Sequence, residues 1–237
     1  MGLSFEELDY RPTPIGALSL RRRHEPKLGV DVFEIKLGEA FLMSSLFTAS
    51  EIALARLGLA ALSGDTLDVV VGGLGLGYTA RAVLENDAVG DLLVVDALQP
   101  IIDWHETGLL PLGAALTGDP RCRFRHGDFF ALAAAPEGFD AAAPGRRFDG
   151  ILVDIDHSPD DLLDPQNAGF YTPEGLGALR GHLKDGGVFG LWSNDRPDDG
   201  FTARLSAVFA EARAEPVTFH NPIQELDATQ TVYLARR

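Results

Sequence analysis

Residues 69–79 read Val-Val-Val-Gly-Gly-Leu-Gly-Leu-Gly-Tyr-Thr, and this stretch decides the fold. The valines are typical of a buried strand, and the residues from about Thr79 to Glu85 have the pattern of a helix. Glycine lets the backbone turn tightly between the two and approach a ligand closely, and the start of a helix favours electron-rich groups. The stretch therefore predicts a strand, a helix and between them a ligand-binding loop with Gly73, Gly75 and Gly77. A tight turn that binds nothing remains the alternative.

Buried-strand patterns recur along the chain and alternate with helical stretches. The apolar runs are residues 67–71, 91–96, 122–124, 148–154 and 187–192. Near-continuous apolar runs of this kind are typical of a parallel sheet covered on both faces. Residues 216–220 and 229–234 look like two further strands joined by a polar loop. We therefore expect an α/β fold, with a mostly parallel seven-stranded sheet and an antiparallel C-terminal edge.

The first part of the chain has a different pattern. Residues 18–23 and 30–37 alternate, or nearly alternate, between apolar and polar side chains, and residues 40–44 follow a turn at Gly38-Glu39. This pattern predicts a small antiparallel β unit of about three strands. The pattern becomes helical from Thr48, with Ser50 as the expected N-cap and Glu51 in the first turn. We therefore divide the chain into residues 1–47 and residues 48–237.

The composition excludes several classes of partner. The chain has 237 residues with Lys+Arg 20 against Asp+Glu 35, a formal net charge of −15. Such an acidic chain is not expected to bind nucleic acid or an anionic membrane surface. No apolar run approaches the roughly 18 residues of a membrane span, and Glu6, Glu7 and Asp9 stand where a signal peptide needs basic residues. The single cysteine, Cys122, excludes an internal disulfide, so we expect a cytoplasmic protein.

Two acids predict a nucleoside site next to the glycine loop. Asp96 is the last residue of the next predicted strand, roughly twenty residues after the loop. At this position an acid accepts hydrogen bonds from both ribose hydroxyls. Asp128 follows the next strand and could accept a hydrogen bond from an adenine amino group, while Phe129 contacts the ring. The alternative for Asp128 is that it caps the following helix.

Further polar residues follow the fourth and fifth parallel strands, whose carboxyl ends face the same crevice. Asp154 is a candidate general base or anchor for a cation, and Asp156 and His157 are candidate helpers. Trp192 could hold a cationic substrate by a cation–π contact, and Asn194, just after the same strand, is a second candidate for contact with the substrate. Oxygen ligands at these strand ends could also hold Mg²⁺, but acids are so frequent in these loops that we expect no metal.

Together these motifs resemble the Rossmann-like class I S-adenosylmethionine-dependent methyltransferase fold. Within it, the N-terminal β unit, Gly72-Gly73, Asp119-Pro120-Arg121 and the acid-rich segment after Asp154 are similar to spermidine synthases, the polyamine aminopropyltransferases. The resemblance implies that the chain binds S-adenosylmethionine or its decarboxylated form as a donor. It also implies a homodimer formed through the N-terminal strands.

The sequence departs from the spermidine synthase pattern at three places. Gly75 stands where these enzymes have an acid, and His157 stands where their loop has its second acid. Residues 50–53, Ser-Glu-Ile-Ala, occupy the region of a Tyr-His-Glu stretch that helps to hold the diamine. The chain is thus similar to a divergent member of the family.

The leading hypothesis is a transferase that moves an aminopropyl or methyl group from a sulfonium to a small cationic amine. The acids around the expected site would attract such an amine. Two alternatives remain: a methyltransferase, with or without Mg²⁺, that acts on another small molecule, and a nucleoside-binding protein that has lost catalysis.

Overall fold

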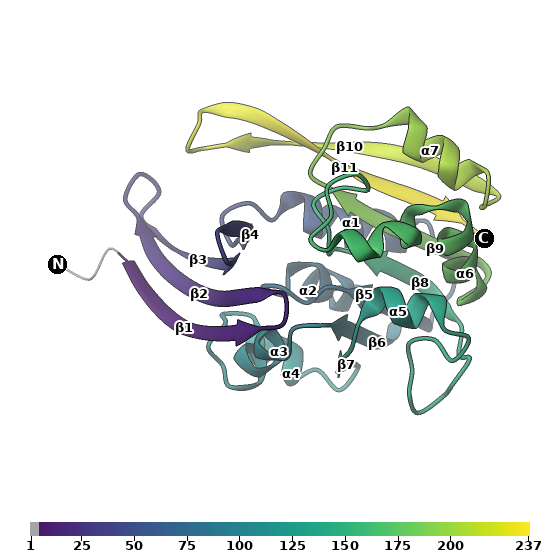
Figure 1. The fold of residues 1–237 in the computed structure, drawn as a ribbon, viewed down its shortest axis with the longest axis horizontal. Helices are drawn as coiled ribbons and strands as arrows, with labels where there is room; N and C mark the ends of the chain where they lie inside the picture. Colours follow the sequence, from purple (N-terminus) through teal and green to yellow (C-terminus); the bar gives the residue numbers. More distant parts are fainter. Residues whose placement is uncertain (1–4) are drawn as a thin grey trace.

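The computed structural model describes residues 5–237 as two β-sheets with helices around the larger one (Figure 1). Residues 1–4 of the predicted N-terminal unit lie outside the described residues. The larger sheet has seven strands in the order β10-β11-β9-β8-β5-β6-β7. Strands β7, β6, β5, β8 and β9 run parallel, and β11 is antiparallel to both β9 and β10. The predicted Rossmann-like α/β fold with an antiparallel C-terminal edge is therefore confirmed.

The strands of the larger sheet coincide with the apolar runs of the sequence. They are β5 (Leu67–Gly72), β6 (Val89–Asp96), β7 (Cys122–His126), β8 (Phe148–Val153), β9 (Leu183–Ser193), β10 (Glu211–Asn221) and β11 (Leu226–Arg236).

Helices cover both faces of this sheet. Those on one side are α1 (Ala49–Ala60), α2 (Tyr78–Leu84), α3 (Gln99–Glu106) and α4 (Gly113–Thr117). Those on the other side are α5 (Phe129–Ala134), the 3-10 helix η1 (Pro165–Tyr171), α6 (Pro173–Gly181) and α7 (Asp199–Ser206). Val69 and Val71 pack into the first hydrophobic core and Val70 into the second, because successive side chains of a strand point to opposite faces. Within residues 5–237, no helix is long and apolar enough to cross a membrane.

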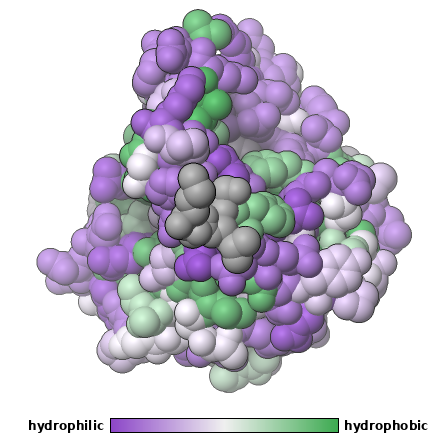
Figure 2. Space-filling model, turned by 90° about the vertical axis from the view of Figure 1, so that its left-hand side faces the viewer, coloured by the Kyte–Doolittle hydropathy of each residue, from purple (hydrophilic) through white to green (hydrophobic). Residues whose placement is uncertain are grey.

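The N-terminal sheet has four strands rather than the predicted three or so. They are β1 (Phe5–Thr13), β2 (Gly16–Glu25), β3 (Val30–Leu37) and β4 (Ala40–Ser44), paired in that order. The prediction missed β1 because its side chains are mostly polar and none is fully buried. Leu18, Leu20 and Ile35 point inward and join the first core of the larger sheet. Figure 2 views the molecule from the side of this sheet and shows a mostly hydrophilic surface with smaller apolar patches.

Helix α1 begins differently from the prediction. Thr48, not Ser50, occupies the N-cap position, and Thr48 makes no capping hydrogen bond through its side chain. Ser50 already lies inside the helix, and its hydroxyl accepts a hydrogen bond of 2.8 Å from Nε1 of Trp192. The side chain of Ser50 thus bonds to Trp192 instead of capping the helix, and this hydrogen bond joins the first turn of α1 to β9.

Ion pairs join several strands near the amino ends of the parallel sheet. Arg146 lies 2.7 Å from Asp91, 2.9 Å from Asp140 and 2.9 Å from Asp68. Lys184 continues the set with contacts of 2.7 Å to Asp68 and 2.8 Å to Asp149. Part of the acid surplus is therefore neutralised at this edge of the sheet. We refer to this group of residues as the amino-edge network.

Candidate active site

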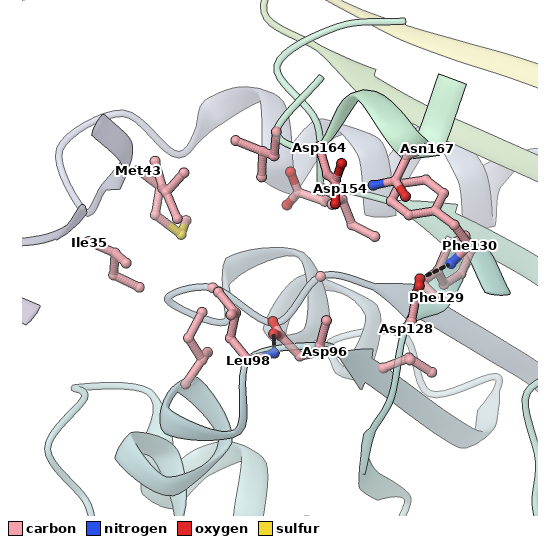
Figure 3. Close-up of a pocket in the computed structure, with 18 of the residues that line it drawn as sticks. Ile35, Met43, Asp96, Leu98, Asp128, Phe129, Phe130, Asp154, Asp164 and Asn167 are labelled. Atoms are coloured by element: carbon pink, nitrogen blue, oxygen red, sulfur yellow. Dashed lines mark hydrogen bonds between the residues drawn. The ribbon is translucent and has the colours of Figure 1, made fainter. Parts of the chain in front are cut away.

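A cavity of about 240 Å³ lies at the opposite edge, where the parallel strands end and the N-terminal sheet approaches them (Figure 3). This is the place where open α/β sheets bind ligands. The predicted residues that line it are Gly73, Gly75, Asp96, Asp128, Phe129, Asp154 and Trp192. The other predicted residues, Gly77, Asp156, His157 and Asn194, are not among those that line it.

The glycines of the loop between β5 and α2 are required by packing inside the protein. Gly73 has φ +91°, and a Cβ at this position would overlap the carbonyl oxygen of Asp154. Gly77 has φ +92°, and a Cβ there would lie 2.9 Å from the ring of His105. That ring donates a hydrogen bond of 2.9 Å from Nε2 to the carbonyl oxygen of Gly75, and burial lowers the pKa of His105. The tight-turn alternative therefore explains Gly73 and Gly77, although Gly73 and Gly75 also face the cavity.

Asp96 is held in a fixed orientation at the end of β6. One carboxylate oxygen accepts a hydrogen bond of 2.9 Å from the backbone nitrogen of Leu74, and the other accepts one of 2.8 Å from that of Leu98. Burial raises the pKa of Asp96, and these backbone hydrogen bonds act in the opposite direction. A carboxylate has about four acceptor positions. Asp96 can therefore still accept hydrogen bonds from two hydroxyl groups in the cavity.

Asp128 caps α5, which is one of the two roles that the sequence left open. Its Oδ1 atom caps α5 by accepting hydrogen bonds from the backbone nitrogens of Phe130 (2.9 Å) and Ala131 (3.2 Å). Within residues 5–237, no backbone nitrogen donates a hydrogen bond to the Oδ2 atom, which could accept one from a ligand amino group. Phe129 is 2% exposed and stacks on Phe139 in the core, with ring centroids 4.9 Å apart. The half-buried ring of Phe130 also lines the cavity, and the prediction missed it.

Glu51 is a second residue of the cavity wall that the sequence analysis did not assign to the site. It lies in the first turn of α1, is 7% exposed and lines the cavity together with Asp154. Burial and the nearby Asp154 carboxylate raise the pKa of Glu51 to about 7. Burial also raises the pKa of Asp154 to about 6, against a hydrogen bond of 2.7 Å from the hydroxyl of Thr79. Burial of two neighbouring carboxyl groups thus favours the retention of a proton within the pair near neutral pH.

The side chains behind Glu51 fix its position. The Ser50 hydroxyl lies 2.7 Å from Oε2 of Glu51 and 2.5 Å from Oε1 of Gln230, and it accepts a hydrogen bond from Nε1 of Trp192. The Trp192 ring is thereby held at the wall of the cavity beside the carboxyl pair. An aromatic face next to two acids is a favourable surface for an ammonium group.

Three predicted residues hold the surrounding loops instead of facing the cavity. Asp156 is 2% exposed and accepts hydrogen bonds from the hydroxyl of Tyr171 (2.7 Å) and the backbone nitrogen of Leu163 (2.9 Å). Nε2 of His157 lies 3.4 Å from the carbonyl oxygen of Phe41, and Oδ1 of Asn194 accepts from Gln230 at 2.7 Å. The structure thus places the side chains of Asp156, His157 and Asn194 in contacts with neighbouring loops and strands, outside the set of residues that line the cavity.

Among the described residues, no Lys or Arg forms an ion pair with Glu51, Asp96, Asp128 or Asp154. In the same part of the chain, no group of three or more His, Cys, Asp or Glu side chains is arranged to hold a metal ion. The cavity is thus negative in charge at its polar end.

Comparison with solved structures identifies the fold. The chain is similar to a spermidine synthase solved in complex with the transition state analogue AdoDATO, with a TM-score of 0.74 and 19% identity over 97% of this chain and 73% of the other. It is similar to the spermidine synthase from Thermotoga maritima, with a TM-score of 0.72 and 19% identity over 97% and 72% of the two chains. No protein-family model and no curated protein matches the sequence. The chain thus has a spermidine synthase-like fold with a divergent sequence.

Proposed function

We propose that this protein is a spermidine synthase-like transferase that moves an alkyl group from a nucleoside sulfonium to a small amine. The leading candidate for this group is aminopropyl. One observation carries the proposal. A single cavity joins Asp96 and Asp128, which suit a nucleoside, to the carboxyl pair of Glu51 and Asp154, which suits an amine. The fold that the chain shares with the two spermidine synthases supports the same reaction class.

The donor is S-adenosylmethionine or its decarboxylated form. Asp96 would accept hydrogen bonds from the two ribose hydroxyls, and Oδ2 of Asp128 would accept one from the adenine amino group. Phe130 and Ile155 line the same cavity and offer apolar surface to the adenine ring. The sulfonium then lies between this half of the cavity and the carboxyl pair.

The transfer is an in-line displacement. The lone pair of the acceptor nitrogen attacks the carbon next to sulfur, and the carbon–sulfur bond breaks with its electron pair moving to sulfur. The leaving group is a neutral thioether, so the protein mainly has to position the reactants. Asp154, ionised above a pKa of about 6, accepts the proton that the amine must lose.

Methyl transfer is a second candidate, and the glycine loop favours it. Gly75 carries no acid that could pair with a donor amine, and the Met43 sulfur lies where a side chain at Gly75 would extend. The Met43 sulfur also accepts a hydrogen bond of 3.0 Å from the backbone nitrogen of Leu76. A donor tail that carries only an amine would therefore find no carboxylate near Gly75, whereas the tail of S-adenosylmethionine also carries a carboxylate, which an acid at this position would repel.

The experiment that tests the proposal measures binding first and products second. Isothermal titration with S-adenosylmethionine, its decarboxylated form and 5′-methylthioadenosine should show binding of at least one of them. Turnover with an amine panel, followed by mass spectrometry, should yield 5′-methylthioadenosine for aminopropyl transfer or S-adenosylhomocysteine for methyl transfer. If none of the three nucleosides binds, the proposal is wrong.

A variant pair separates catalysis from binding alone. Asp154→Asn should keep nucleoside binding and lose the product, whereas Asp161→Asn, an exposed acid of the same loop region, should keep both. Nucleoside binding without any Asp154-dependent product would favour the alternative of a binding protein that has lost catalysis.

The division of the chain at residue 48, the cytoplasmic location and the homodimer stay predictions. Size-exclusion chromatography with light scattering would test the homodimer.

A further inference from the structure

One end of the cavity has no charged lining residue. The lining residues from the N-terminal sheet, the turn between β1 and β2, and the start of α3 are all apolar. They are Ile15, Ile35, Leu42, Met43, Leu98 and Ile101. Figure 3 shows Ile35 and Met43 on the side of the cavity away from Asp128 and Phe129.

The charged lining residues come from other elements. They are Glu51, Asp96, Asp128, Asp154 and Asp164, and none of them belongs to the N-terminal sheet. A linear diamine with one ammonium at the carboxyl pair and its chain along the apolar end would place the second ammonium against hydrocarbon. Burying an ammonium without a partner is costly, whereas burying a methyl group there is favourable.

We propose that the acceptor is a monoamine whose single ammonium lies at Glu51 and Asp154 and whose uncharged, apolar arm lies against the N-terminal sheet. The inference rests on the proposed function, because it takes the carboxyl pair as the amine site. The inference adds a preference between two classes of amine. Monoamines with an alkyl or aryl arm bind in the cavity, and linear diamines with the same carbon chain bind more weakly.

The test is a binding measurement with two amines that have the same six-carbon chain. Hexylamine and 1,6-diaminohexane are titrated by calorimetry into the full chain, both alone and saturated with 5′-methylthioadenosine. Hexylamine should bind at least about tenfold more tightly, since only the diamine must desolvate a second ammonium.

A variant locates the apolar arm. Ile15 lines the cavity but is 47% exposed, so the chain should tolerate Ile15→Glu. The new carboxylate should weaken the binding of hexylamine, strengthen that of the diamine and so reduce or reverse the preference. Tyr10→Glu is the matched control, because Tyr10 is 57% exposed on β1 and does not line the cavity. It should leave the preference unchanged.

The outcomes distinguish this inference from the proposed function. Nucleoside binding combined with equal or tighter binding of the diamine overturns the inference and leaves the proposed function standing. Preference for hexylamine without any nucleoside binding supports the inference and refutes the proposed function. If neither amine binds, or if Ile15→Glu leaves the preference as it is, the inference is wrong.

Discussion

Replacing Glu51 by Gln should make the protein more stable at pH 8 and less sensitive to pH. The reason is that the folded chain raises the pKa of Glu51 from its ordinary value of 4.5 to about 7, through burial and then through the charge of Asp154. For a carboxyl group with a raised folded pKa, the folded state retains its proton where the unfolded state has lost it. Glu51 therefore costs no stability below about pH 4, and its cost grows as the pH rises and is complete above pH 7. Gln cannot ionise and never incurs this cost.

The size of the effect follows from the interval between the two pKa values. At about 1.4 kcal/mol per pH unit, ionising Glu51 in the fold costs on the order of 3 kcal/mol of the free energy of unfolding. Part of that cost is already present at pH 5, where the unfolded chain has mostly lost the proton. Between pH 5 and pH 8 the contribution of Glu51 is therefore about 2–3 kcal/mol.

Urea unfolding at pH 5 and pH 8 measures this contribution without any substrate. Between pH 5 and pH 8, the free energy of unfolding of the wild-type protein should fall by about 2–3 kcal/mol more than that of Glu51→Gln. Glu137→Gln, which removes an exposed carboxyl group, should behave as the wild type does. If Glu51→Gln shows the same fall in stability as the wild type, Glu51 does not ionise in a buried site and the carboxyl pair is refuted.

Four further predictions concern the nucleoside site, the glycine loop, helix α6 and the cysteine. Asp96→Ala should weaken nucleoside binding by at least about tenfold in calorimetry because two charge-assisted hydrogen bonds are lost, and unchanged affinity would contradict the assignment. Gly73→Ala should lower the free energy of unfolding by about 3 kcal/mol, through its positive φ and its overlap with a carbonyl oxygen. Gly177→Ala in α6, where a Cβ meets nothing within 4 Å, should raise it by about 0.5–1 kcal/mol in the same urea assay. Cys122 should react with iodoacetamide far more slowly than free cysteine at pH 7.5, since burial raises its pKa to about 12, and rapid alkylation of the folded protein would contradict this.

The larger sheet could be predicted because its strands carry their signal locally. A buried parallel strand needs apolar residues on both faces, so runs such as residues 67–71 stand out without any knowledge of their neighbours. β1 could not be predicted in this way. Its side chains are largely exposed, and the strand exists because its backbone pairs with β2.

The site could be predicted where the residue type and its place at a strand end sufficed, as at Asp96 and Asp154. Glu51 was missed because an acid in the first turn of a helix ordinarily interacts with the helix dipole. Only the packing of α1 against the sheet places Glu51 opposite Asp154. Asp156 was assigned to the site for its position in the sequence, but the loop turns its carboxylate toward Tyr171.

The amino-edge network has a consequence for how salt acts on this molecule. Its short contacts link Arg146 and Lys184 to acids at the start of the strands, whereas the acids of the cavity have no such partners among residues 5–237. Added salt screens interactions across long distances in solvent more than contacts between partly buried groups. Raising the ionic strength should therefore slow the capture of a cationic ligand while the sheet stays folded. The charges that join the strands and the charges that attract a ligand lie at opposite edges of the sheet. Substitutions in the amino-edge network should therefore change the stability of the fold with little effect on ligand capture, and substitutions of the cavity acids should change ligand capture with little effect on the amino-edge network.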